Sequence, residues 1–84
     1  MKLIATGSGL IHGYVVKLYW RPELDGKGWR NCVVTCPGKR KANRFYECSW
    51  NGERFKRTNF RDMKRVHRIC VVIWLQKTFS LIEF

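Results

Sequence analysis

The dipeptide Asn51-Gly52, between two strand-like runs, constrains the fold of this chain more than any other feature. Asn-Gly in that setting is the strongest short signal for a β-hairpin, because a type I′ turn needs a positive φ at both central residues. Taken as a two-residue loop, the turn sets Cys48 opposite Phe55. A slip of one residue would exchange the two faces of the ribbon. The sequence therefore predicts an antiparallel hairpin over 43–57.

In this register the two faces of the hairpin differ in polarity. The apolar face, which we expect to join the core, carries Tyr46, Cys48, Trp50 and Phe55. The polar face carries Phe45, Glu47, Ser49, Arg54 and Lys56. Glu47 opposes Lys56, which indicates a cross-strand ion pair. The turn chemistry and the face pattern thus favour the same register.

Two further strands are predicted before the hairpin. Residues 14–20 alternate in polarity, and residues 29–36 are rich in β-branched side chains. Residues 1–5 would form a short edge strand, which Gly7-Ser8-Gly9 would end.

After the hairpin, three- and four-residue spacing predicts a short amphipathic helix over 59–68 with a cationic outer face. Its apolar stripe would consist of Phe60, Met63 and Val66, with His67 as a further candidate. Thr58 or Asn59 would be its N-cap. The apolar run 69–75 then predicts a buried strand, and 78–84 a last strand.

Together these elements predict a single compact domain over 1–84. Its fold class is α+β, with a small antiparallel sheet of about five or six strands and one amphipathic helix packed on it. The segments 69–75 and 79–84 would also suit edge strands that pair with a second copy, which would give a homodimer.

Positive charge is concentrated in the middle of the chain. Residues 39–68 contain eleven Lys and Arg against three acids, a net charge of +8 out of the chain's +11. Such a field favours a negatively charged partner, and the phosphate backbone of nucleic acid is the most abundant one in a cell. We therefore predict a small basic protein that binds DNA or RNA by electrostatic capture of phosphates. The predicted contacts, from a loop, the hairpin and the helix, are Lys39, Arg40, Lys41, Arg44, Arg54, Lys56, Arg57, Arg61, Lys64 and Arg65.

Most aromatic residues fall on faces assigned to the core. These are Trp20, Trp50, Phe55, Phe60 and Trp74. Tyr19, Trp29 and Phe45 fall on the other faces of their strands, where exposed rings can stack on unpaired bases. These three residues are the predicted base-stacking positions.

Two other interpretations of the charge stay open. A solvated basic surface would only keep a small protein in solution. Alternatively, the protein would be an inhibitor or adaptor, of the kind that phages encode, which docks on an acidic surface of a host protein. Charge complementarity speeds such docking equally well. Nucleic acid and an acidic protein surface call for the same lysines and arginines.

Neither a membrane partner nor an exported protein is expected. The longest apolar run, 69–75, has seven residues, whereas a spanning helix needs about 20. Glycines interrupt the N-terminal apolar stretch too often for a signal peptide. We therefore expect a cytoplasmic protein.

In that compartment the four cysteines would be reduced thiols. They are Cys32, Cys36, Cys48 and Cys70. Their spacings lack the paired C-x2-C knuckles of a zinc site, and their apolar surroundings suit core residues. Core thiols are the prediction, with a zinc site and a disulfide as the alternatives, and no metal or other cofactor is expected.

The chain shows no pattern typical of catalysis. It has no close pair of carboxylates, no P-loop, no G-x-G-x-x-G and no G-x-S-x-G. Glu47 suits an ion pair and Asp62 the first turn of a helix. We therefore predict no catalytic residues and a protein that is not an enzyme.

The order of a strand at 29–36, a basic turn, a hairpin and a helix resembles plant AP2-type domains and the arm-binding domains of some phage integrases. Those domains lay a three-stranded sheet, backed by a helix, in a major groove. Trp29 and the turn Pro37-Gly38-Lys39-Arg40 are similar to the AP2 style. The resemblance covers roughly half of the chain, and the Asn51-Gly52 hairpin departs from it, so it implies a fold-level analogy alone.

Overall fold

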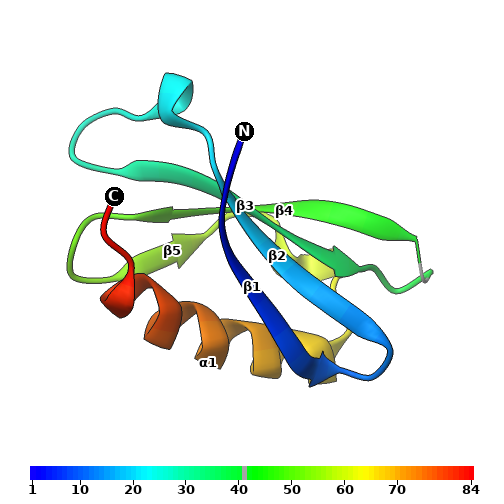
Figure 1. Ribbon diagram of the computed structural model, residues 1–84. Coiled ribbons are helices and arrows are strands. Elements are labelled where there is room, and N and C mark those ends of the chain that lie inside the picture. Colours follow the sequence, from blue (N-terminus) through cyan, green and yellow to red (C-terminus); the bar gives the residue numbers. More distant parts are fainter. Residues whose placement is uncertain (41) are drawn as a thin grey trace.

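The computed structural model describes residues 1–40 and 42–84. Its strands form one antiparallel sheet in the order β1-β2-β3-β4-β5, so each strand pairs with its neighbours in sequence (Figure 1). The strands are β1 (Lys2–Ile11), β2 (Tyr14–Trp20), β3 (Arg30–Pro37), β4 (Asn43–Trp50) and β5 (Phe55–Arg57). Two 3-10 turns and one helix complete the described fold, namely η1 (Pro22–Leu24), η2 (Phe60–Asp62) and α1 (Arg65–Leu81). The predicted class, α+β with a small antiparallel sheet and one helix, is confirmed.

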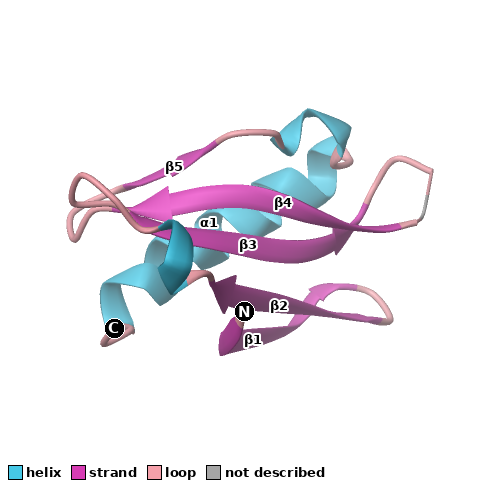
Figure 2. Cartoon of the chain, turned by 90° about the horizontal axis from the view of Figure 1, so that it is seen from above, coloured by secondary structure: helices cyan, strands magenta, loops and turns pink. Residues whose placement is uncertain are grey.

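α1 lies across one face of the sheet and leaves the other face uncovered (Figures 1 and 2). Alternation along the strands directs one set of side chains toward the helix. The buried members of this set are Ile11, Val16, Leu18, Cys32, Val34, Cys36, Tyr46, Cys48 and Trp50. Val71, Leu75 and Phe79 come from α1 at four-residue spacing and complete the same core. Phe79 stacks on Trp50 with the ring planes 5° apart.

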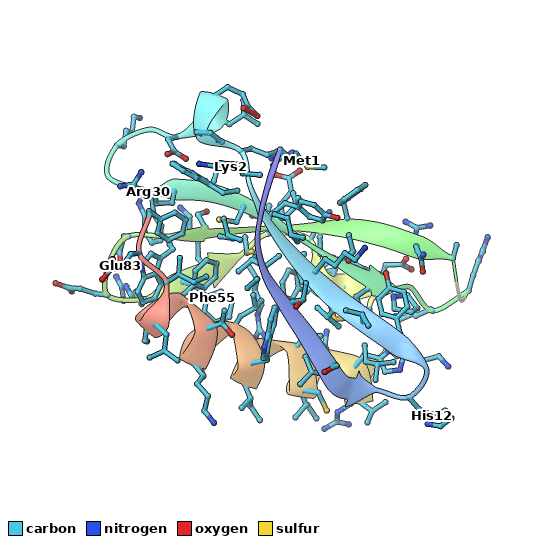
Figure 3. The ribbon with its side chains drawn as sticks, viewed as in Figure 1. Met1, Lys2, His12, Arg30, Phe55 and Glu83 are labelled. Atoms are coloured by element: carbon cyan, nitrogen blue, oxygen red, sulfur yellow. The ribbon has the colours of Figure 1, made fainter. Side chains whose placement is uncertain are left out.

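The C-terminal residues close the core beyond the last turn of α1. Phe84 meets Trp20 edge to face, with ring centroids 5.3 Å apart. The Arg30 guanidinium lies 5.2 Å from the Trp20 ring and 5.1 Å from the Phe84 ring. Figure 3 shows Arg30 beside this end of the chain. The aromatic residues assigned to the core are thus buried or packed against it, as predicted.

The predicted strands at 69–75 and 78–84 are wrong, because one helix runs from Arg65 to Leu81. A continuous apolar run suits a buried strand and a buried helix equally well by composition. The four-residue spacing of Val71, Leu75 and Phe79 is the signal that distinguishes a helix from a strand here. No Gly or Pro follows Gly52, which also permits a long helix. Because neither of these strands exists, the prediction of a homodimer through edge strands loses its basis. None of the described helices is long and apolar enough to cross a membrane.

The predicted short helix over 59–68 is also wrong in extent. Phe60 and Met63 are buried as expected, but η2 holds only 60–62 and Met63 is extended. Val66 points to solvent, 62% exposed. Asn59 precedes η2 but forms no side-chain capping hydrogen bond there, because its Oδ1 accepts the Glu47 N–H at 2.7 Å. The turn is therefore tied to β4, and α1 begins only after it.

The hairpin exists, but its predicted register is wrong. Residues 51–54 form a four-residue loop, so Cys48 opposes Arg57 and Phe55 opposes Trp50. The Oδ1 atom of Asn51 accepts two backbone N–H groups at 2.9 Å, from Glu53 and Arg54. Side-chain bonding of this kind lets Asn close a wider turn. Because the shift is two residues, the predicted faces of the hairpin are preserved.

A turn with two positive φ angles does occur, but at Lys27-Gly28, where φ is 55° and 82°. Gly26 and Trp29 exchange backbone hydrogen bonds of 3.2 and 3.0 Å across it. Strand β1 is likewise longer than the predicted 1–5. It continues through Gly7 and Gly9 to Ile11 with irregular register.

Candidate nucleic-acid interface

The face of the sheet that α1 leaves uncovered is called the open face below. Figure 2 looks onto this face, with α1 behind the strands. Its cross-strand rows follow from the register of β2, β3 and β4. One row joins Lys17, Thr35 and Phe45, and the next joins Tyr19, Val33 and Glu47. A third row joins Asn31, Ser49 and Lys56.

Two aromatic rings lie together at one end of the open face. Tyr19 and Phe45 meet edge to face, with ring centroids 6.2 Å apart. Phe45 is 54% exposed although it lies within β4. A shallow hollow of about 410 Å³ lies beside the rings. Its lining consists of Tyr14, Val15, Lys17, Tyr19, Thr35, Asn43, Arg44 and Phe45.

A third ring lies toward the other end of the open face. Trp29 directly precedes β3 and is half-buried. The Nζ atom of Lys56 lies 4.4 Å from the centroid of the Trp29 ring. Six residues of strand separate Trp29 from Thr35, the neighbour of Phe45, which corresponds to about 20 Å at the usual rise. The three predicted stacking residues therefore share one face and are spread along it.

The open face carries one acid among its described strand residues, Glu47. Its carboxylate lies 3.7 Å from Arg21, not beside Lys56 as predicted. Arg21 also donates from Nε to the Asn31 side chain at 2.7 Å. The register shift explains the change of partner, because Lys56 now opposes Ser49.

Most of the predicted phosphate contacts gather where the turn after β3 meets η2. Gly38 and Met63 form a β-bridge, and the Lys39 N–H donates to the Asp62 carbonyl at 2.9 Å. Arg44 and Asp62 form an ion pair of 2.8 Å. We call this region the strap end. Its cations are Lys39, Arg40, Arg44, Arg61, Lys64 and Arg65.

The electrostatics of the strap end are one-sided. Arg44 is engaged with Asp62, and no other strap-end cation forms an ion pair with a described acid. Lys64 is the N-cap of α1, and the first turn of the helix contains no acid. Acids are the residues that stabilise a helix N-terminus. The helix dipole therefore adds to the positive potential of the side chains there.

The remaining predicted contacts lie elsewhere. Lys56 is on the open face, and Arg57 is at the end of the edge strand β5. Arg54 lies in the 51–54 loop, separated from the strap end by the length of β4. Lys41 lies outside the described residues. Lys17 was not among the predicted contacts, although the alternation of 14–20 put it on the same side as Tyr19, and the structure has it in the same cross-strand row as Phe45.

Three of the four cysteines are core thiols, as predicted, whereas Cys70 on α1 is only half-buried. Cys32, Cys36 and Cys48 are buried, and all four cysteines are free. Burial raises the pKa of Cys36 to about 11. Burial, with a smaller effect of Asp25, raises the pKa of Cys32 to about 12. Burial likewise raises the pKa of Cys48. These thiols therefore stay protonated at neutral pH, when they are poor ligands and nucleophiles.

Comparison of the chain with protein-family models, curated proteins and solved structures found no match.

Proposed function

We propose that this protein binds nucleic acid on its open face. The observation that carries the proposal is the position of Tyr19, Trp29 and Phe45 on the sheet face that α1 does not cover. Phe45 is exposed within β4, and Tyr19 lies beside it, so the rings form a small group and not a single exposed side chain. Bases stack on such rings with about 1–3 kcal/mol per base, whatever their identity.

Cations accompany the rings in positions that suit phosphates. Lys17 lies in the same cross-strand row as Phe45, and Lys56 lies over Trp29. The strap end adds a larger group of cations at one end of the sheet. A strand that stacks on the open face would have its backbone within reach of both sources of charge. Binding of this kind is strong at low salt and largely independent of sequence.

The spread of the rings favours an unpaired strand. Bases in a duplex present their edges and not their faces, so they cannot stack on protein rings without leaving the helix. The separation of about 20 Å between the two aromatic ends is long enough for several nucleotides of an extended strand. We therefore expect single-stranded DNA or RNA to bind more tightly than a duplex of the same length.

Fluorescence anisotropy with labelled oligonucleotides of about 16 nucleotides, a length at the upper end of site sizes for small folds, tests the proposal. Phe45→Ala should weaken binding of the single strand by about 1–3 kcal/mol. Leu81→Ala, which removes an even more exposed apolar side chain from α1, is the matched control and should leave the affinity unchanged.

A charge variant tests the proposal through an expected increase in affinity. Glu47→Gln removes the acid from the open face and should raise the affinity, since the carboxylate repels phosphate. Equal affinities for wild type, Phe45→Ala and Glu47→Gln would contradict the open face as the site. Purification with and without nuclease and high salt gives an independent check. Nucleic acid that accompanies the protein only without the treatment supports the proposal, whereas a stoichiometric protein partner opposes it.

A further inference from the structure

The side of α1 that faces away from the sheet carries apolar side chains that the core does not use. Val66, Ile69 and Ile73 are 62%, 53% and 60% exposed. Their spacing of three and four residues lines them up along one side of the helix. We call these three residues the helix ridge. Figure 3 shows side chains projecting from this side of α1 into open space. Exposed apolar groups in a contiguous row, unlike isolated ones, mark interaction surfaces.

A hollow runs beside the helix ridge, between α1 and β1. Its volume is about 320 Å³. Its lining consists of Gly9, Leu10, Cys70, Ile73, Trp74 and Lys77. The neighbouring Gly7 lets β1 approach closely here, since a Cβ atom at Gly7 would come within 2.8 Å of Trp74. The helix ridge and the hollow together form a mainly apolar surface, in which a protruding row of side chains lies beside a depression.

The charge around this surface has one sign. From Met63 to Ile82 the chain contains no Asp or Glu. The same stretch contains the cations Lys64, Arg65, Arg68 and Lys77. Lys77 lines the hollow itself. A partner must therefore match apolar side chains in the middle and supply negative charge at the edges.

We propose that the helix ridge and its hollow dock an acidic amphipathic segment of a partner protein. Apolar side chains of the segment would enter the hollow against Leu10 and Trp74. Its carboxylates would lie beside Arg65 and Lys77. An amphipathic helix set in an apolar groove is a common mode of peptide recognition. This surface is on the opposite side of the sheet from the open face, so the proposal does not depend on nucleic-acid binding, and both partners could be bound at once.

Charge argues against a second copy of this chain as the occupant. Two α1 helices packed antiparallel about a two-fold axis, with Ile69 of each copy against Ile73 of the other, would also set Arg65 against Lys77. Like charges in direct opposition disfavour such a pair. Neither copy has an acid on this helix to relieve the repulsion.

Shape argues against an anionic membrane. Cations beside an apolar row also suit a lipid surface. A bilayer, however, presents no defined side chains, so the hollow between α1 and β1 would stay unfilled. A protein segment can fill it and gains the packing energy of that contact.

The test uses a synthetic helical peptide of about 20 residues, roughly 30 Å long, with leucine on one side and glutamate on the other. Fluorescence anisotropy measures its binding to the full chain and to the double variant Ile69→Ser/Ile73→Ser. Both positions are exposed, so the variant should fold, which its thermal midpoint checks. We expect binding to weaken at least tenfold. Val15→Ser, an exposed apolar position on the open face, is the matched control and should bind as wild type.

Four outcomes would overturn the proposal. A peptide with serine in place of leucine should bind at least tenfold more weakly, and equal binding would mean that charge alone is responsible. Absence of binding up to millimolar peptide would also exclude the proposed partner. Light scattering and vesicles containing phosphatidylserine test the rivals. A dimer, or vesicle binding, that Ile69→Ser/Ile73→Ser abolishes would assign the helix ridge to a second copy or to lipid. None of these outcomes bears on the oligonucleotide measurements.

Discussion

At the scale of single residues, Gly38 shows how closely the strap end is packed. A Cβ atom there would lie 2.7 Å from the Asp62 Oδ2 atom and 3.1 Å from the Tyr46 hydroxyl. Asp62 would have to move together with Arg44, because the same oxygen is paired with the Arg44 Nε atom. Space, and not backbone angle, therefore favours glycine at this position.

We predict that Gly38→Ala destabilises the fold by about 1–3 kcal/mol, the usual cost of forcing extra atoms into a packed site. Urea denaturation gives the free energy of unfolding. Gly26→Ala is the matched control, because a Cβ atom at Gly26 meets nothing within 4 Å. The control should be neutral or slightly stabilising, since alanine restricts the unfolded chain. Equal losses in both variants would contradict the close approach.

The buried thiols lead to a second prediction at this scale. Alkylation requires an accessible thiolate, and Cys32 and Cys36 are buried with raised pKa values. Iodoacetamide at pH 8 should therefore modify Cys70 in the folded protein and the other cysteines only after unfolding. Mass spectrometry of the digested peptides identifies the modified sites, and Cys70→Ser should remove the early modification. Rapid modification of Cys32 in native protein would contradict the buried core.

The same pKa values predict a loss of stability in alkali. In the unfolded chain these thiols ionise near their ordinary value of 9.0, whereas in the folded protein Cys36 and Cys32 hold their protons to about 11 and 12. The folded state thus binds protons more tightly. Their contribution to stability is fully present below pH 9 and is lost as the pH rises from about 9 to 12. Urea midpoints measured between pH 8 and pH 11 should show this decline.

At the scale of elements, α1 separates into two sides with different roles. Phe79 is buried against Trp50, Phe55 and Phe84. Ile73, six residues earlier on the same helix, is largely exposed. One helix can carry a buried side and an exposed apolar side, because residues six apart point in different directions when the period is 3.6 residues.

We therefore predict that Phe79→Ala costs about 3–5 kcal/mol of stability, the usual range for a buried aromatic residue. Ile73→Ala should change stability by about 0.5 kcal/mol or less, as exposed substitutions do. Thermal or urea unfolding of the two variants measures the difference. A buried strand over 69–75 would make Ile73→Ala costly as well, so similar losses in the two variants would contradict the exposed side of α1.

At the scale of the whole molecule, the fold is a compact layer of sheet on helix with a different chemistry on each side. Its radius of gyration is 12.0 Å, close to the roughly 12 Å expected of a single compact domain of this length. Aromatic rings and lysines occupy the open face, and the apolar ridge occupies the far side of α1. Cations of the strap end lie where the two layers meet.

We predict that the affinity for single-stranded nucleic acid falls steeply with salt. Each phosphate contact that is lost should reduce the slope of log K against log salt by about 0.7 for a single strand. The double variant Lys39→Gln/Lys64→Gln should therefore reduce the slope by about 1.4. Anisotropy titrations between 50 and 300 mM salt measure the slope of log K against log salt. Lys77→Gln, a cation of the same helix outside the strap end, should leave the slope unchanged, and a flat response in wild type would contradict phosphate capture.

Much of the sheet could be predicted because strand formation here rests on local patterns. Alternation along 14–20 assigned Tyr19 and Lys17 to one side, and the structure has them on the open face. The loop at Asn51-Gly52 was predicted, but its length depends on which backbone groups Asn51 bonds. The two loop lengths differ by only a few hydrogen bonds, and the residue types in the loop do not specify which of these form.

The sequence by itself determined which faces are apolar, where positive charge is concentrated and which rings stay out of the core, since these depend on side-chain spacing alone. For residues 65–81 the apolar run fits a strand or a helix, and the tertiary structure decided for the helix, because the core side of the sheet needs a cover that Val71, Leu75 and Phe79 supply from one side of α1. The tertiary structure also decided which cations lie in the same region. Lys39 and Arg61 are far apart in the chain and share the strap end through contacts of Gly38, Arg44 and Asp62. Contacts between distant segments depend on how the layers pack, and no local pattern encodes them.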